Sequence, residues 1–225
     1  MKELFAEPVW DEVLKFWHRG PADIYVGEEQ KSYRALKEYD HYSDVLDIGA
    51  HIGWFTRYAK RELNAGFVYA VEPDPNNAKI YRLNHSPHLY GSMISFEEAA
   101  IISNGGQSLE LQLSHKYPAN NRSDRQIQGR KSVRVKTLEF QTFLHNVRTP
   151  ELLKIDIEGA EYTLDFSWLP PTLRAIAIEY HQFDIGMLEK QMNLHEIFLE
   201  NGFKAVTKPK EKVTFQKITT GVYLR

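Results

Sequence analysis

A short apolar strand that runs into a glycine loop and then into a helix is the feature that most limits how this chain folds. The expected strand Val45–Ile48 leads into Gly49–Gly53, and a helix with aromatic residues follows. Gly49 and Gly53 supply backbone that bends tightly and comes close to a ligand, and the first turn of the helix offers free N–H groups. Phosphate or carboxylate groups bind at such helix starts. The segment therefore predicts a strand–glycine–helix cofactor loop.

The spacing within this loop distinguishes between two cofactors. A nicotinamide fingerprint follows the pattern G-x-G-x-x-G, but counted from Gly49 this chain has His51 and Trp54 at the second and third glycine positions. Both side chains are bulky where a pyrophosphate needs room. Asp47, just before the loop, would repel a pyrophosphate but could pair with a cationic amino-acid cofactor. The pattern favours S-adenosylmethionine. The expected cofactor-binding residues in this segment are Asp47, Gly49, Ala50, His51 and Gly53.

An acid at the end of the second expected strand suits the ribose of that cofactor. The strand 67–72 ends in Glu72 and is followed by Pro73, about 25 residues after Asp47. A carboxylate can accept both hydroxyl protons of a ribose diol, which is why an acid recurs at this position in nucleoside-binding folds. The alternative is that Glu72 only stabilises the start of the next helix, near Asn76. We expect Glu72 and Pro73 to contact the cofactor.

Three charged residues alternate along a third expected strand. The segment Leu152–Glu161 reads as a strand that enters a helix, with Lys154, Asp156 and Glu158 on one strand face. A central strand of a parallel sheet is normally apolar on both faces, and burying an unpaired charge costs several kcal/mol. The alternative is a buried Lys–carboxylate pair that only satisfies itself. We favour a chemical site, because perturbed ionisable clusters occur more often in sites than in inert cores.

Together these segments resemble the FkbM family of S-adenosylmethionine-dependent methyltransferases. The resemblance covers roughly residues 43–205 and departs from the family at His51, where Asn is common. It implies a seven-stranded methyltransferase sheet, transfer of a methyl group to a hydroxyl oxygen, and a place for Glu158 in the pocket. The segments that carry it are Val45–Gly53, Val71–Pro75 with Leu83-Asn84, and Leu153–Glu161, with weaker echoes at Val135–Leu138 and Ile178–His181.

Methyl transfer gives the charged residues expected roles. Asp156, at the carboxyl end of its strand, orients the acceptor or takes its proton and also contacts the cofactor, while Lys154 holds that carboxylate ionised. Glu158 is ambiguous, since an acid in the first turn of a helix is stabilising in itself. Glu179 shares a proton or an ion pair with Lys154. His181 follows Glu179 by two residues, on the same strand face, where it positions the acceptor, acts as the base, or is a satisfied sheet-end residue.

The rest of the chain alternates between strands and helices. This predicts an α/β fold with a doubly wound, mostly parallel, seven-stranded, Rossmann-like sheet. A helix is expected from Pro8 to His18, within an N-terminal helical extension over residues 1–40. The last two strands, 204–207 and 221–224, are joined by a short polar stretch and should form an antiparallel hairpin at one edge. The expected strands are 45–48, 67–72, 92–96, 108–113, 132–136, 152–157, 175–179, 204–207 and 221–224.

A polar, irregular segment from His115 to Lys131 interrupts this alternation. We expect a surface loop. It is either a lid or acceptor-binding loop that favours an anionic substrate, or a solvated insert whose charges provide solubility. Its positive residues are Lys116, Arg122, Arg125, Arg130 and Lys131, against the single negative Asp124.

Composition sets few further limits. The 225 residues, of which 42% are hydrophobic, are enough for the core of one domain over residues 1–225. A net charge of −2 gives no reason to expect nucleic acid or an anionic membrane as a partner, and the lack of cysteine excludes disulfides and thiolate metal sites. His85 and His88 resemble a metal pair only loosely, so no metal is expected. Without a signal peptide or a membrane-length apolar run, a cytoplasmic protein is expected.

The sequence leaves three functions open. The main hypothesis is an O-methyltransferase that acts on a hydroxyl group of a small molecule or glycan. The first alternative is a nucleic-acid ribose 2′-O-methyltransferase, because a Lys-Asp-Glu set also suits a 2′-hydroxyl, although balanced charge and the lack of a basic aromatic surface disfavour it. The second is a cofactor-binding module without chemistry, as His51 weakly suggests. Fold alone does not decide between them.

Overall fold

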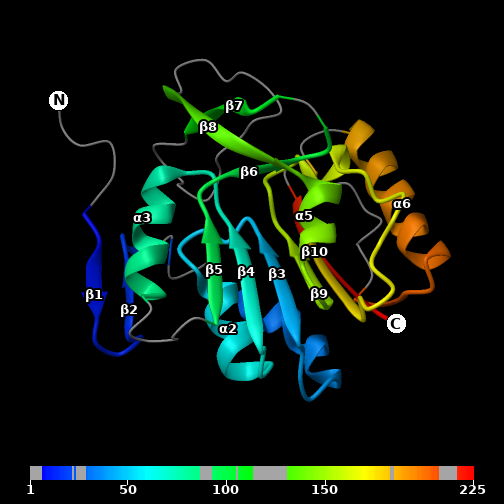
Figure 1. The fold of residues 1–225 in the computed structure, drawn as a ribbon, viewed down its shortest axis with the longest axis horizontal. Coiled ribbons are helices and arrows are strands. Elements are labelled where there is room, and N and C mark those ends of the chain that lie inside the picture. Colours follow the sequence, from blue (N-terminus) through cyan, green and yellow to red (C-terminus); the bar gives the residue numbers. More distant parts are fainter. Residues whose placement is uncertain are drawn as a thin grey trace.

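The main sheet of the computed structural model has the strand of Lys154 near its centre. The structure describes residues 7–21, 23, 29–86, 93–104, 106–113, 131–182, 185–207 and 217–225. Within them, a seven-stranded sheet has the order β11-β12-β10-β9-β3-β4-β5 (Figure 1). The prediction of a Rossmann-like α/β fold is confirmed. The strands of this sheet are β3 (Asp44–Ile48), β4 (Phe67–Val71), β5 (Ile94–Glu97), β9 (Pro150–Ile155), β10 (Ala175–Gln182), β11 (Lys204–Thr207) and β12 (Lys217–Leu224).

The strand order reverses between β3 and β9. β3 pairs in parallel with both β4 and β9, and the chain extends the sheet first beyond β4 to β5 and later beyond β9 to β10. In open α/β sheets, ligands bind at such a reversal, outside the carboxyl ends of the strands. The topology therefore places a site where β3 and β9 end.

The C-terminal strands form the expected antiparallel hairpin at one edge. β12 runs antiparallel to both β10 and β11, and β11 is the edge strand. β12 begins at Lys217, earlier than the expected start at Gly221. The polar residues Thr219 and Thr220 concealed that start, because they interrupt the apolar pattern of a buried strand.

Alternation along the central strands sends the polar residues to one face of the sheet. Val45 of β3, Leu152 of β9 and Ala177 of β10 belong to one buried cluster, which also contains residues of η1 (Glu29–Glu38) and α2 (Trp54–Glu62). Side chains two residues apart on a strand share a face. The residues two places further along these three strands are Asp47, Lys154 and Glu179.

A smaller sheet lies above the carboxyl ends of the main strands in Figure 1. Its order is β6-β8-β7, with β8 parallel to β6 and antiparallel to β7. β7 (Ser108–Leu113) and β8 (Lys131–Glu139) correspond to two expected strands, whereas β6 (Ala100–Ile102) was not expected. The expected loop 115–131 lies outside the described residues, except for Lys131 at the start of β8. The other described elements are α3 (Pro75–Asn84), α5 (Phe140–Asn146), α6 (Ile185–Glu200) and η2 (Glu161–Thr163).

The helix expected from Pro8 to His18 is wrong. This segment forms an antiparallel hairpin of β1 (Val9–Asp11) and β2 (Phe16–His18). Asp11 Oδ1 accepts hydrogen bonds of 2.8 Å from the backbone N–H groups of Val13 and Leu14, which closes the turn. Trp10 and Trp17 are cross-strand partners with ring centroids 5.7 Å apart. The described part of the expected helical extension therefore combines a hairpin with η1.

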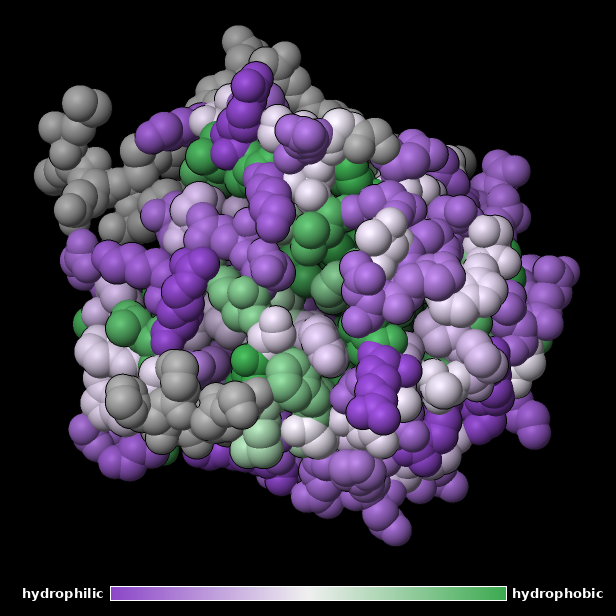
Figure 2. All heavy atoms as spheres, viewed as in Figure 1, coloured by the Kyte–Doolittle hydropathy of each residue, from purple (hydrophilic) through white to green (hydrophobic). Residues whose placement is uncertain are grey.

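The face shown in Figure 2 is hydrophilic around its periphery, with hydrophobic residues gathered near the middle. None of the helices in the described part of the chain is long and apolar enough to cross a membrane.

Candidate active site

The loop after β3 meets the end of β9 at Gly49. Gly49 and Ala50 donate their N–H groups to the Val71 carbonyl at 2.9 and 3.0 Å, and Asp156 N donates to the Ile48 carbonyl at 3.0 Å. Gly49 has a φ of +77°, and a Cβ there would lie 1.7 Å from the Asp156 carbonyl oxygen. Glycine is required because two strand ends touch at this point. The contact brings the predicted cofactor loop to the predicted catalytic acid.

His85 holds the far end of the loop. Gly53 has a φ of +98°, and a Cβ there would lie 2.0 Å from His85 Nε2. That nitrogen donates to the Gly53 carbonyl at 2.9 Å. Burial lowers the pKa of His85 to about 3, so the ring is neutral at physiological pH. His85 thus supports the loop, while His88, the second residue of the loose metal pair, lies outside the described residues.

Lys154 and Asp47 form a buried pair beneath the loop. They are partners in the β3–β9 register, with Lys154 Nζ 3.3 Å from Asp47 Oδ1. Lys154 also donates to the Gly49 carbonyl at 2.6 Å, and Thr56 Oγ1 donates to Asp47 Oδ2 at 2.6 Å. Burial opposes the charge of Lys154, but the carboxylates of Asp47, Asp156 and Glu179 outweigh it and raise the lysine pKa. Asp47 is therefore occupied by protein partners, and a direct contact with the cofactor remains a prediction.

The sequence suggested that Asp156 and Glu158 lie on a strand face, but both lie beyond the end of β9. β9 ends at Ile155, and the expected helix is wrong, because η2 is a single 3₁₀ turn. Glu158 lies in a turn with a φ of +57°, which is strained for a residue with a side chain. The two acids nevertheless converge on His181, whose Nε2 is 3.8 Å from Asp156 Oδ1 and 3.5 Å from Glu158 Oε2.

Glu161 orients His181 from the opposite side. Glu161 Oε1 accepts a hydrogen bond of 2.8 Å from His181 N and lies 3.3 Å from His181 Nδ1, while Oε2 accepts one of 2.8 Å from Gly159 N. Burial lowers the pKa of His181, but Glu158, Glu161 and Asp156 outweigh burial and hold that pKa well above its ordinary value. Burial also raises the pKa of Glu158 to about 8. The neighbouring carboxylates therefore favour the protonated form of His181.

Glu179 completes the cluster. Its Oε1 accepts a hydrogen bond of 2.8 Å from Tyr33 Oη of η1. One ligand atom from each of Asp156, Glu179 and His181 lies within 4.8 Å of the others, close enough to hold a metal ion. Lys154 supplies positive charge at the same place, with Nζ 3.7 Å from Asp156 Oδ2. The expectation of no metal stays a prediction.

Glu72 faces the cofactor loop from the end of β4. Its Oε2 accepts a hydrogen bond of 2.9 Å from His51 N, and its Oε1 accepts from Asp74 N and Asn77 Nδ2 at 2.9 and 3.1 Å. The residue that caps α3 is Asp74, which accepts from Asn76 N at 2.8 Å. Glu72 therefore does not serve as the helix cap. Burial, with Asp74 beside it, raises the pKa of Glu72 to about 7. Pro73 links it to that cap.

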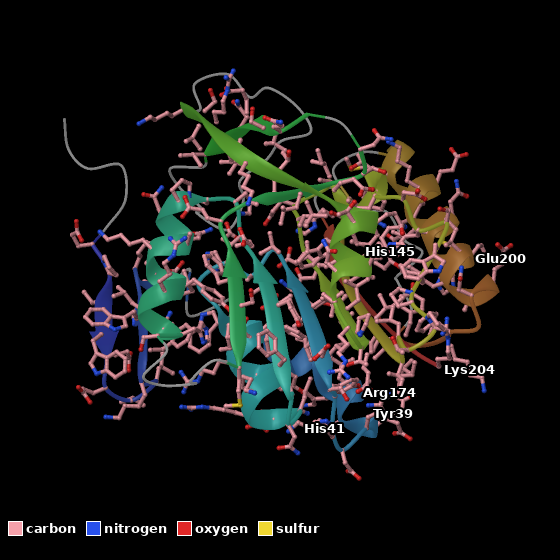
Figure 3. The ribbon with its side chains drawn as sticks, viewed as in Figure 1. Tyr39, His41, His145, Arg174, Glu200 and Lys204 are labelled. Atoms are coloured by element: carbon pink, nitrogen blue, oxygen red, sulfur yellow. The ribbon has the colours of Figure 1, made fainter. Side chains whose placement is uncertain are left out.

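A different cluster lies at the other end of the strands, away from the candidate site. Figure 3 shows Tyr39, His41 and Arg174 together at the lower end of the main sheet. The Arg174 guanidinium lies 4.5 Å from the Tyr39 ring centroid and donates to the His41 carbonyl and to Glu151 Oε2, at 2.5 and 2.8 Å. Glu151 stands on β9, like Lys154, but at the other end of the strand. A substitution of Glu151 therefore serves as a control for substitutions of the acids at the candidate site.

The sequence of residues 47–205 matches the methyltransferase FkbM domain, a match that covers more than half of the chain. The chain belongs to the FkbM methyltransferase family. It is thus a methyltransferase dependent on S-adenosylmethionine, as the resemblance implied. A comparison with curated proteins finds no matching sequence.

Several solved methyltransferase structures are loosely similar to this FkbM-family chain. The FkbM methyltransferase from Methylobacillus flagellatus is 13% identical with a TM-score of 0.48, covering 83% of this chain and 44% of that one. Precorrin-6Y C5,15-methyltransferase from Geobacter metallireducens is 14% identical with a TM-score of 0.46, covering 88% and 85%. TrmK from M. capricolum, solved with S-adenosylhomocysteine, is 9% identical with a TM-score of 0.46, covering 86% and 67%. The present chain spans less than half of the M. flagellatus protein.

The residues around the loop fit the cofactor of the FkbM family. Gly49 and Gly53 bend the loop through positive φ values, and Gly53, the N-cap of α2, has no side chain that could cap this helix. Glu72 presents a buried carboxylate to that loop. These groups would hold the ribose and the amino-acid end of S-adenosylmethionine.

Sequence reasoning missed several polar residues that the structure brings to this FkbM-family site. Some act through partners far away in the sequence and others through partners four to nine residues away, so residue spacing alone does not distinguish them. Glu161 alone carried a signal, as a second acid in the charged segment. The missed residues are Arg19, Asp23, Tyr33, Thr56, Asn77 and Glu161.

Proposed function

We propose that this FkbM-family protein transfers a methyl group from S-adenosylmethionine to a hydroxyl oxygen of a small molecule or a glycan. The position of Asp156 carries the proposal. Its side chain is 21% exposed, whereas the side chains of Lys154 and His181 are 4% and 1% exposed. Asp156 is therefore the member of the cluster that an acceptor reaches most easily.

Asp156 is the proposed general base. When bound, S-adenosylmethionine supplies a methyl group on a positively charged sulfur, which is already a strong electrophile. The chain then has to hold the acceptor oxygen in line and remove its proton. The Asp156 backbone lies against Gly49, and Lys154 Nζ lies 2.6 Å from the Gly49 carbonyl and 3.7 Å from Asp156 Oδ2, so the carboxylate is close to the cofactor loop. A hydroxyl group bound there would give up its proton to Asp156.

Two cations fix the Asp156 carboxylate. Lys154 Nζ lies 3.7 Å from one oxygen and His181 Nε2 lies 3.8 Å from the other. Because its acidic neighbours raise the pKa of His181 and favour the protonated ring, we do not assign the base to His181. We assign orientation of the carboxylate to Lys154 and His181.

The other acids of the cluster favour binding of an uncharged or cationic acceptor over an anionic one. Glu158, with a pKa raised to about 8 by burial, is mostly protonated near neutral pH. Glu161 and Glu179 are buried and add negative charge around the same histidine and lysine. Acids thus outnumber cations in the described cluster, and a polyanion such as RNA would be repelled.

Product analysis tests the proposal. Purified protein is incubated with S-adenosylmethionine and a panel of sugars, glycans and other hydroxyl compounds, and release of S-adenosylhomocysteine is followed. We expect turnover with a hydroxyl compound and, by NMR of the product, a new methyl group on oxygen. A methyl group on carbon or nitrogen would contradict the proposal, as would turnover with RNA alone. Glu151→Gln, at the far end of β9, is the control that should turn over normally.

A further inference from the structure

The N-terminal hairpin brings a cation against the cofactor loop. Arg19 directly follows β2, and its Nη2 lies 2.7 Å from Asn77 Oδ1 and 3.3 Å from His51 Nε2. Asn77 in turn donates to Glu72 Oε1 at 3.1 Å. Arg19 precedes residues 47–205, which match the FkbM domain. A residue outside the matched region therefore reaches the predicted cofactor site.

Asp23 fixes one side of the Arg19 guanidinium. Arg19 Nε and Nη2 donate to the two carboxylate oxygens of Asp23, both at 3.0 Å, and Arg19 N donates to Oδ2 at 2.8 Å. Trp54 Nε1, at the start of α2, donates to the Asp23 carbonyl at 2.7 Å. A two-point contact with a carboxylate sets the plane of a guanidinium. Arg19 is thus held in place before any ligand arrives.

The other side of the guanidinium is unused. The Arg19 side chain is 5% exposed, and its Nη1 is buried with no hydrogen-bond partner among the described residues. Nη1 carries two N–H donors, and a buried donor without an acceptor is unfavourable. His51 Nδ1, in the same cluster, is a second buried nitrogen without such a partner in the described part of the chain. An anionic ligand group at this place would satisfy Nη1.

The charged residues at the loop leave this role to Arg19. Asp47, Glu72 and Asp156 are acids. Lys154 is already engaged by the Gly49 carbonyl at 2.6 Å and by Asp47 at 3.3 Å. Burial lowers the pKa of His51 to about 4, so His51 is neutral at physiological pH. S-adenosylmethionine brings one anionic group, its α-carboxylate, which needs a cation or N–H donors where it binds.

We propose that Arg19 forms a carboxylate subsite, in which Nη1 donates to the α-carboxylate of S-adenosylmethionine. The proposal rests on the cofactor use described above and adds the hairpin to the binding site. The hairpin then distinguishes ligands that keep the amino-acid carboxylate from nucleosides that lack it.

Calorimetry with two ligands tests the subsite. S-adenosylhomocysteine has the carboxylate, and decarboxylated S-adenosylhomocysteine lacks only that group. Arg19→Met should weaken binding of the first about 10- to 100-fold, the range for a hydrogen bond between charged groups, and change binding of the second less than about 3-fold. Equal weakening of both ligands would overturn the proposal, because it would show that Arg19 only supports the fold.

Two further variants keep this test interpretable. Arg57→Met is the matched control, since the Arg57 guanidinium packs on the same hairpin, 5.2 Å from the Phe16 ring centroid and 5.7 Å from that of Trp54. It should change both affinities alike. If Arg19→Met fails to fold because Asp23 is left unpaired, Arg19→Met with Asp23→Asn removes both charges and should show the same ligand selectivity. Wild-type protein that binds neither ligand would refute the cofactor assignment itself.

Discussion

Lys154 of β9 lies directly opposite Asp47 of β3, with its ammonium 3.3 Å from the carboxylate and both side chains buried. The pair joins the strand that leads into the cofactor loop to the strand that leads into Asp156. Replacing a buried ion pair with apolar residues can be neutral, but removing one partner leaves an uncompensated charge. The stability of the sheet is therefore tied to the residues that position the site.

Lys154→Met should destabilise the protein strongly. It leaves Asp47 buried without its cation, for which the expected loss is about 3–5 kcal/mol in the free energy of unfolding. Urea denaturation measures this loss. Lys37→Met is the control, since Lys37 pairs with Glu62 at 2.6 Å on the surface, where removing the pair should cost less than about 1 kcal/mol. Similar losses for both variants would show that the Lys154–Asp47 pair has no special role.

Glu158→Gly should separate stability from activity. Glu158 has a φ of +57°, and glycine adopts that conformation without strain, so the variant should unfold at an equal or higher temperature. Turnover should fall, because the carboxyl group next to His181 is lost. Thermal denaturation and an assay of S-adenosylhomocysteine release measure the two effects. Lower stability with full turnover would make Glu158 a structural residue.

Strand alternation made the centre of the site predictable. Glu179 and His181 stand two residues apart on β10, so the sequence alone placed them on one face, and the structure brings both next to Asp156. The tight bends at Gly49 and Gly53 were also predictable from the sequence, and both residues adopt positive φ values. Periodicity and glycine positions are local properties, and a sequence shows them directly.

The missed features depend on contacts that residue spacing does not reveal. Glu161 bonds His181 across 20 residues, and its own segment resembles the start of a helix. The hairpin was missed because Trp10, Leu14 and Trp17 occur at helical spacing. The turn closes when Asp11 accepts two backbone hydrogen bonds, and spacing does not show whether this turn or a helix is more stable.

Glu72 should give the stability of the protein a characteristic pH dependence. Burial raises its pKa from 4.5 to about 7, so between these values the folded state binds a proton that the unfolded chain has released. Stability from this group should therefore fall as the pH rises from 4.5 to about 7 and level off above. Urea denaturation across this range should show a flatter dependence for Glu72→Gln. Glu97→Gln, at an exposed position of β5, should behave like the wild type. An unchanged slope for Glu72→Gln would exclude this carboxyl group as the cause.

Asp156→Asn tests the proposed chemistry most directly. Asparagine keeps the size of the side chain and some of its hydrogen bonding but cannot accept the hydroxyl proton as a carboxylate does. Affinity for S-adenosylhomocysteine, measured by calorimetry, should stay within about 3-fold, while turnover of a hydroxyl acceptor should fall by about 10²–10⁴, the range for a lost general base. Turnover at the wild-type rate with unchanged affinity would contradict the assignment of Asp156 as the base and would make the buried charged cluster structural.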